Sequence, residues 1–220
     1  MATKDISTIQ PPFFVKSFEK DFATKTIIGS KKTTFQTLGD IIKTGTIKPN
    51  TKSFGYKKRL SCTLLHKNYT KTYRSQGIIF TTKTTPDYIA PFDIVLLAQT
   101  NNIITQYYRI ENNLHLYYNH TLIPGFKSFI FRNISMMIKK ISDPKQAWRM
   151  VNEFRKTAGY GTLSKKKYRL VQYNEVIFHK PVKINPIAIY GYTKESREQA
   201  RKYGLRHFTS AKVFYRKFGN

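Results

Sequence analysis

The sequence predicts an α+β protein: an antiparallel-rich sheet with a few packing helices, an extended basic N-terminal arm and a C-terminal helical pair. Short apolar or β-branched runs bounded by turn-forming residues recur between residues 60 and 190 and indicate strands. Capped amphipathic segments at 33–45 and 142–159 indicate helices. The 220 residues are 40% hydrophobic and 15% aromatic, which suits a chain with a buried core rather than a disordered one.

The predicted organisation has three parts. Residues 1–33 form an extended arm, in which FFVKSF follows Pro11-Pro12 and supplies aromatic anchors. Residues 34–190 form the α+β core, with basic loops at 46–59 and 158–169. Residues 191–220 form a basic helical extension.

Strand-like runs occupy most of the predicted core. Glu111-Asn112-Asn113 separates two such runs and predicts a tight hairpin, because Asn tolerates positive φ. Pro186 lies inside the last run and indicates a sheet edge or a break. The other predicted strands are LSCTLLH (60–66), GIIFTT (77–82), FDIVLLAQ (92–99), FKSFIFRNI (126–134), KYRLVQ (167–172), NEVIFH (174–179) and VKINPIAIY (182–190).

Four segments have helix signals. Thr34 caps the segment at 33–45, where Phe35, Leu38, Ile41 and Ile42 share a face, and Gly45 ends it. In the segment at 142–159, Ser142 or Asp143 is the cap, Pro144 suits the first turn and Gly159 ends it. Three basic residues of this segment lie outside its predicted apolar stripe: Arg149, Arg155 and Lys156. The stripe comprises Ala147, Trp148, Val151, Phe154 and Ala158.

The last two helices differ in character. The segment at 193–204, capped by Thr193 and closed by Gly204, is almost wholly polar, with Ala200 and Tyr203 to bury. Such a helix bridges solvent or lies on another molecule. The segment at 209–219 is amphipathic, and the residues that can bury one side are Ala211, Phe214, Tyr215 and Phe218.

Charge is the strongest indication of function. Lys and Arg total 39 against 12 Asp and Glu, a net charge of +27, with a pI near 10.1. A compact state with this charge repels itself, and a polyanion relieves the repulsion through phosphate contacts and counterion release. Nucleic acid is therefore the leading partner, ahead of a solvated basic surface and an anionic membrane surface. The longest apolar run, 89–98, contains Asp93 and is too short to span a bilayer.

The sequence does not indicate an enzyme, a metal or a cofactor. Asp87 and Asp93 are the one near carboxylate pair in an apolar setting, but no Asp/Glu-x-Lys follows, and Asp87 fits a turn after Pro86. Cys62, the single cysteine, is predicted to be a small buried residue. No nucleotide-binding glycine motif is present, and the histidines lack metal-ligand spacing: His66, His115, His120, His179 and His207.

Three stretches are candidates for RNA contact. KSFGYKKR has aromatics that can stack on bases beside basic residues, although the aromatics can equally pack inward. AGYGTLSKKKYR is predicted to contact the phosphate backbone. The alternative is that it ends a helix and continues as a solvated run of charges. The closing twenty residues contain six basic residues and no acid. The candidate residues are Lys52, Phe54, Tyr56, Lys57, Lys58, Arg59, Lys165, Lys166, Lys167, Arg169, Arg201, Lys202, Arg206, Lys212, Arg216 and Lys217.

The whole chain is rich in lysine, with 28 Lys against 11 Arg, and contains basic stretches such as KPNTKSFGYKKR, TLSKKKYR and YGLRHFTSAKVFYRKFG. In this general character it resembles mitochondrial ribosomal proteins encoded by AT-rich organellar genomes. The resemblance implies ribosomal RNA binding without catalysis, neighbouring ribosomal proteins as partners and a mitochondrial location, with cytoplasm or virion as alternatives. Two other functions stay open. One is a viral or nucleoid protein that packages DNA, and the other is a nucleic-acid-processing enzyme.

Overall fold

The computed structural model describes residues 11–28, 31–50, 60–92, 131–141, 143–157, 161–165, 168 and 171–219. These residues form eleven strands and five helices, so the predicted mixture of α and β structure is confirmed. The hairpin predicted around Glu111-Asn112-Asn113, and all of the strand predicted at 92–99 after Phe92, lie outside the described residues.

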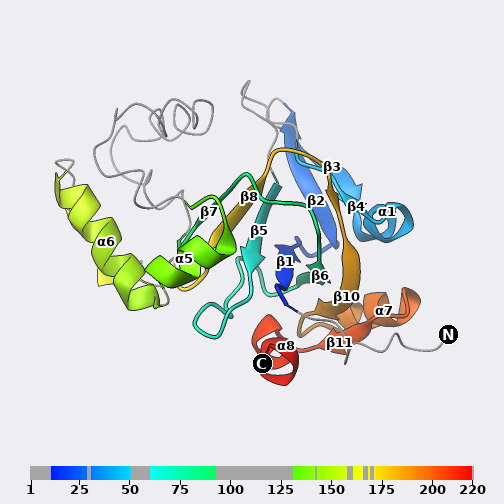
Figure 1. Ribbon diagram of the computed structural model, residues 1–220. Coiled ribbons are helices and arrows are strands. Elements are labelled where there is room, and N and C mark those ends of the chain that lie inside the picture. Colours follow the sequence, from blue (N-terminus) through cyan, green and yellow to red (C-terminus); the bar gives the residue numbers. More distant parts are fainter. Residues whose placement is uncertain are drawn as a thin grey trace.

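A seven-stranded, mainly antiparallel sheet forms the centre of the molecule (Figure 1). Its strand order is β11-β10-β6-β1-β5-β8-β7, and β10–β11 is its one parallel pair. The antiparallel-rich sheet predicted from the sequence is therefore present. Its strands are β1 (Phe14–Ser17), β5 (Leu60–Leu64), β6 (Gly77–Thr81), β7 (Tyr88–Ala90), β8 (Glu175–Phe178), β10 (Asn185–Tyr190) and β11 (Arg206–Phe208).

The segment expected to form an N-terminal arm contributes a central strand instead. β1 pairs with β5 on one side and β6 on the other. Phe14 and Val15 point to opposite faces of the sheet, and both are buried. The run of apolar residues in FFVKSF is thus the signature of a strand covered on both faces. Residues 1–10 of the predicted arm lie outside the described part.

Two small sheets flank the large one: β2 (Ala23–Ile28) with β3 (Lys31–Thr37), and β4 (Thr46–Ile47) with β9 (Val182–Lys183). Helix α1 (Leu38–Thr44) follows β3 and starts later than the sequence predicts. Pairing of Thr37 with Ala23 keeps the chain extended through Thr34 and Phe35. Thr37 is therefore the N-cap, in a capping box with Asp40, and Gly45 ends the helix at φ +61° as predicted.

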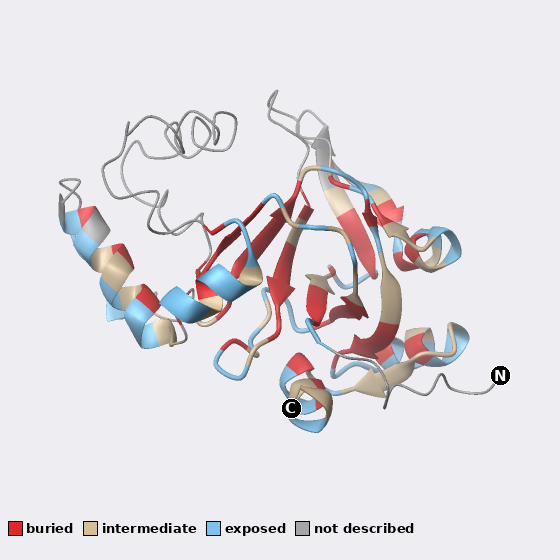
Figure 2. Cartoon of the chain, viewed as in Figure 1, coloured by how far each residue is buried: buried red, intermediate tan, exposed pale blue. Residues whose placement is uncertain are grey.

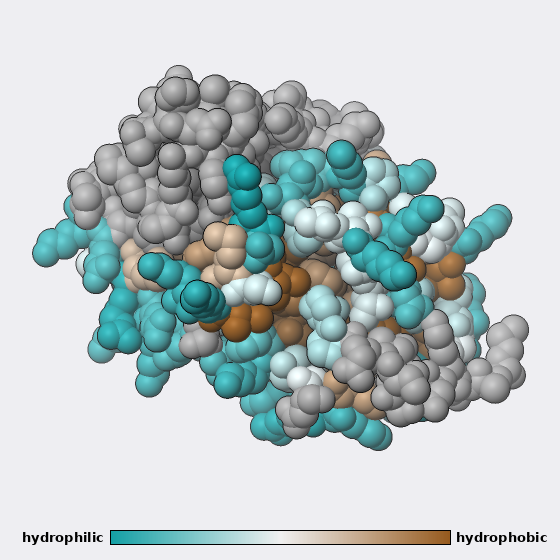
Figure 3. Space-filling view, in the orientation of Figure 1, coloured by the Kyte–Doolittle hydropathy of each residue, from teal (hydrophilic) through white to brown (hydrophobic). Residues whose placement is uncertain are grey.

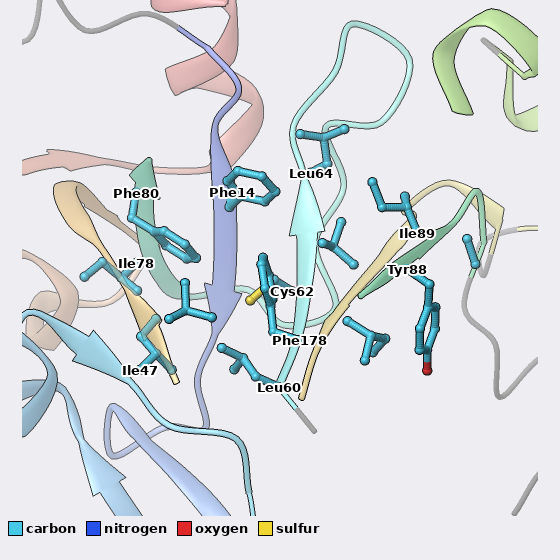
Figure 4. Packing of buried hydrophobic residues seen from close by; sticks show 14 of the residues in the cluster. Phe14, Ile47, Leu60, Cys62, Leu64, Ile78, Phe80, Tyr88, Ile89 and Phe178 are labelled. Carbon is cyan, nitrogen blue, oxygen red and sulfur yellow. The ribbon is translucent and has the colours of Figure 1, made fainter. Parts of the chain in front are cut away.

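The strands of the large sheet are largely buried (Figure 2). Their buried side chains form two separate cores, one on each face of the sheet. We call these faces the α1 face and the α8 face. On the α1 face, Phe14, Phe80 and Cys62 pack beneath α1 and its neighbours, and Figure 4 shows them pointing into one cluster across β6, β1 and β5. On the α8 face, Val15, Ile79 and Tyr190 pack beneath helix α8 (Ala211–Phe218). Alternation along each strand produces this division.

Helices α5 (Ile134–Lys140) and α6 (Pro144–Thr157) lie beside the β7–β8 end of the sheet (Figure 1). Of the strand predicted at 126–134, Phe131 forms an antiparallel bridge with Ile89, whereas Ile134 already begins α5. Asn133 caps α5 by accepting the Met136 N–H at 2.8 Å. Asp143 caps α6, with its carboxylate accepting the Lys145 N–H at 2.9 Å. Residues 126–130 lie outside the described residues.

Packing at the end of α6 corrects one prediction. Arg155, expected outside the apolar stripe, is buried, and its Nε donates to the Gly161 carbonyl at 2.9 Å. The chain folds back over the helix here, because Asn152 also accepts the Leu163 N–H at 2.8 Å. The three described residues of the strand predicted at 167–172 are not in a strand. Tyr168 packs edge-on against Trp148, Val171 is buried in a single 3-10 turn, and Gln172 follows it in a bend.

The C-terminal segment is built into the sheet. Helix α7 (Lys194–Lys202) connects β10 to β11, which lies parallel to β10. The predicted helical pair is present, but the strand between its helices makes this segment part of the core rather than an extension of it. Pro186 lies at a register shift in β10, which accommodates the missing N–H inside the sheet.

Candidate nucleic-acid interface

Helix α8 is held to the sheet by aromatic packing. Ser210 caps it by accepting the Val213 N–H at 3.2 Å. Phe214 is fully buried, with its ring edge-on to Phe13 at a centroid distance of 5.1 Å and to Phe208 at 5.3 Å. Since helix residues three and four apart share a face, burial of Ala211 and Phe214 fixes which side chains point outward. The exposed residues of α8 are Lys212, Val213, Arg216 and Lys217.

The β5–β6 loop, residues 66–76, borders α8. At its start, the Lys67 backbone forms a hydrogen bond with the Tyr215 hydroxyl, while burial raises the pKa of Tyr215. Toward its end, the Arg74 carbonyl accepts from the Tyr190 hydroxyl at 3.3 Å, and Tyr190 belongs to the core beneath α8. Both ends of the loop are therefore attached to the α8 side of the sheet.

We refer to the exposed residues of this loop and of α8 together as the α8–loop surface. They are Lys67, Lys71, Tyr73, Arg74, Lys212, Arg216 and Lys217. Hydrophilic side chains project along the lower edge of the molecule in Figure 3, where Figure 1 places α8.

Carboxylates leave most of this surface unneutralised. Glu19 pairs with Arg74 at 3.1 Å, at one border of the surface. Among the residues that the structure describes, Lys212, Arg216 and Lys217 have no carboxylate partner. Unpaired cations grouped on one helix face attract an extended polyanion.

The structure separates the predicted C-terminal contact residues. Lys212, Arg216 and Lys217 lie on the α8–loop surface, as described. Arg201 and Lys202 are exposed on α7, which packs on the α1 face through Ala200. The same helix also carries exposed Glu195 and Glu198. Arg206 is half-buried, with its guanidinium 6.0 Å from the Phe218 ring centroid. The predicted basic segment is thus not one surface.

The other predicted contact residues are mostly outside the description. Lys165 is exposed. Nothing tests the remaining nine, which lie outside the described residues: Lys52, Phe54, Tyr56, Lys57, Lys58, Arg59, Lys166, Lys167 and Arg169.

Sequence reasoning missed the contribution of the β5–β6 loop. Lys67, Lys71, Tyr73 and Arg74 come from the stretch HKNYTKTYRSQ, whose alternating basic and aromatic residues are the signal that could have identified them. The stretch lies between two strong strands and contains only three Lys and Arg, so the denser lysine runs elsewhere outweighed it.

Helices α5 and α6 carry further exposed basic residues. These are Lys139, Lys140, Lys145, Arg149 and Lys156, with Arg132 just before α5. Exposed Glu153 lies among them on α6. This second basic surface is less uniform in sign than the exposed face of α8.

Among the described residues, one Ser–His pair could suggest catalysis, but its hydrogen bonds give it a structural role. Ser196 and His207 are 3.0 Å apart, but the Ser196 hydroxyl donates to the Thr193 carbonyl at 2.6 Å. His207 Nε2 lies 2.9 Å from the Gly191 carbonyl and donates to it, so it is not a free base for Ser196. Ser196 is also fully buried. The pair therefore fastens α7 to β11.

Two other described residues that the sequence singled out, Asp87 and Cys62, also have structural surroundings. The Asp87 carboxylate accepts the His179 N–H at 2.7 Å and fastens the end of β8; Asp93 lies outside the described residues. Cys62 lies on β5 and is buried on the α1 face of the sheet, and burial raises its thiol pKa to about 12. Within the described ranges, no three His, Cys, Asp or Glu side chains are grouped to hold a metal ion. None of the helices described there has the length and apolarity needed to cross a membrane.

Comparison of the chain with protein-family models, curated proteins and solved structures gives no match.

Proposed function

We propose that this protein is a structural RNA-binding protein, a component of a mitochondrial ribosome that contacts ribosomal RNA through Lys, Arg and aromatic residues. The observation that carries the proposal is the outer face of α8, where Lys212, Arg216 and Lys217 are exposed without a carboxylate partner among the described residues. The adjoining loop adds Lys67 and Lys71.

A nucleic acid suits this surface better than a membrane does. The basic residues occupy a helix packed on the sheet and a loop attached to the sheet, and the loop also carries an exposed tyrosine. Phosphate contacts position a folded RNA, and aromatic rings offer stacking to unpaired bases. The proposal of a mitochondrial ribosome in particular comes from the lysine-rich character of the whole chain, with 28 Lys against 11 Arg.

Salt dependence provides the direct test. Affinity for ribosomal RNA should fall steeply as salt rises, because each phosphate contact adds roughly 0.7–0.9 to the log–log slope. Changing Lys212, Arg216 and Lys217 to Gln should lower the slope by about 2–3 if each contacts one phosphate. Retention of the full wild-type slope in this variant would exclude the exposed face of α8 as part of the interface.

A matched variant controls for net charge. Lys43, Lys48 and Lys194 are also exposed. Lys43 lies on α1 and Lys194 on α7, and both helices pack on the other face of the sheet. Changing these three to Gln removes the same charge and should leave most of the slope unchanged. If both triple variants lose the same affinity, binding is a response to net charge alone.

Two further measurements address the partner. Sedimentation of cell extract should place the protein with ribosomal subunits, and a protein that stays at the top of the gradient would contradict the ribosomal assignment. Competition between folded ribosomal RNA and duplex DNA separates this function from DNA packaging. RNA should compete more strongly, whereas equal competition would support a packaging protein.

A further inference from the structure

Tyr73 is a large aromatic side chain held in an exposed position. It is 59% exposed and lies in the β5–β6 loop, between Lys71 and Arg74. The Arg74 guanidinium lies 4.7 Å from the centre of the Tyr73 ring, a cation–π arrangement. The Tyr173 ring meets it edge-on at 6.1 Å. The ring is thus supported by two neighbours while much of its surface faces solvent.

The backbone on both sides of Tyr73 is fixed from below. The Thr72 hydroxyl donates to the Arg74 carbonyl at 2.7 Å, which closes the chain around Tyr73. The same carbonyl accepts from the Tyr190 hydroxyl at 3.3 Å, and that hydroxyl also lies 3.0 Å from the Ser17 hydroxyl. Tyr190 is buried in β10, so the loop is attached to the sheet at Arg74, the residue after Tyr73.

The Arg74 side chain is fixed as well. Its Nη2 donates to the Glu19 carboxylate at 3.1 Å. The Glu19 backbone is held in turn, because Gln76 Nε2 donates to its carbonyl at 2.7 Å. A ring and a guanidinium positioned before a ligand arrives lose little conformational freedom when it binds.

We propose that Tyr73, supported by Arg74, is a stacking platform for an unpaired base of the bound RNA. This inference rests on the proposed RNA-binding function and adds a preference to it: the α8–loop surface takes RNA at a single-stranded element. Base–aromatic stacking is open to any base, because each has a π-face, and Arg74 adds a cation–π contribution. Lys67 and Lys71 are exposed along the same loop, where the Lys71 ammonium donates to Gln172, and we expect both to contact the backbone of that strand.

Binding of a fluorescently labelled single-stranded RNA and of its duplex to the full chain tests the inference. Tyr73→Ala should weaken single-strand binding by about 5- to 140-fold and change duplex binding much less. The salt slope should stay at the wild-type value, since no phosphate contact is removed. Tyr73→Trp, which keeps a stacking surface, should retain single-strand affinity.

Tyr192→Ala provides the matched control. Tyr192 is 67% exposed but precedes α7, which packs on the opposite face of the sheet, so its removal should leave both affinities unchanged. Equal affinities of wild type and Tyr73→Ala for single-stranded RNA would overturn the platform. So would equal losses for single strand and duplex, or equal losses in the Tyr73 and Tyr192 variants. Failure of the wild-type chain to bind RNA at all would instead refute the proposed function.

Discussion

Replacing Phe214 with alanine should detach the helix that presents the basic surface. Phe214 is fully buried and contacts three other rings, with centroid distances of 5.1 Å to Phe13 and 5.3 Å to both Phe208 and Phe218. Removal of a buried phenylalanine side chain costs about 3–5 kcal/mol through lost burial and the cavity that remains. This site should lie within that range, because its neighbours are themselves large rings that cannot close the gap easily.

Urea unfolding of the full chain at high ionic strength measures this effect. With a slope of about 2 kcal/mol per molar urea, the expected loss moves the midpoint down by roughly 1.5–2.5 M. Val213 is the next residue toward the N-terminus but is 43% exposed, so Val213→Ala should change the free energy of unfolding by less than about 0.5 kcal/mol. Similar midpoints for the two variants would refute the assignment of Phe214 as the anchor of α8.

Three other outcomes follow from the fold. Gly77→Ala should destabilise the protein by about 1–3 kcal/mol or more, because a Cβ there would lie 2.2 Å from the Lys16 carbonyl oxygen. Gly161→Ala should be tolerated, because a Cβ there would have no atom within 4 Å. Equal urea midpoints for the two variants would contradict this. Cys62, whose pKa burial raises to about 12, should resist a maleimide at about pH 8 until urea unfolds the chain, and rapid labelling of the folded protein would contradict its burial. Burial lowers the pKa of both His66 and His207. The charge of Lys67 adds to the shift at His66. At His207 a hydrogen bond to the Gly191 carbonyl opposes the shift, while the charge of Arg197 adds to it. As pH falls below about 6.5, these histidines therefore bind protons in the unfolded chain before they do so in the folded protein, and the urea midpoint should decline. Changing both residues to Gln should flatten this decline, and an unchanged decline would contradict the reasoning.

The candidate interface was only partly predictable. The amphipathic pattern of residues 209–219 predicted that Phe214 packs inward and that Lys212, Arg216 and Lys217 face outward, and the structure confirms this orientation. The sequence could not predict that the β5–β6 loop lies beside α8. That contact joins Lys67 to Tyr215, residues far apart in the chain, and depends on which face of the sheet each segment meets.

The sequence by itself determined the class of fold, the caps of its best-marked helices and the sign of its surface. These are local or additive properties: the Thr193 side chain caps its own helix, and net charge is a sum over residues. Only the tertiary structure decided that FFVKSF lies at the centre of the sheet, that three residues at 206–208 complete its edge, and that Arg155 is buried. A strand's place depends on the strands it pairs with, and those partners are distant in sequence. For the same reason, the basic C-terminal segment became two surfaces on opposite faces of one sheet.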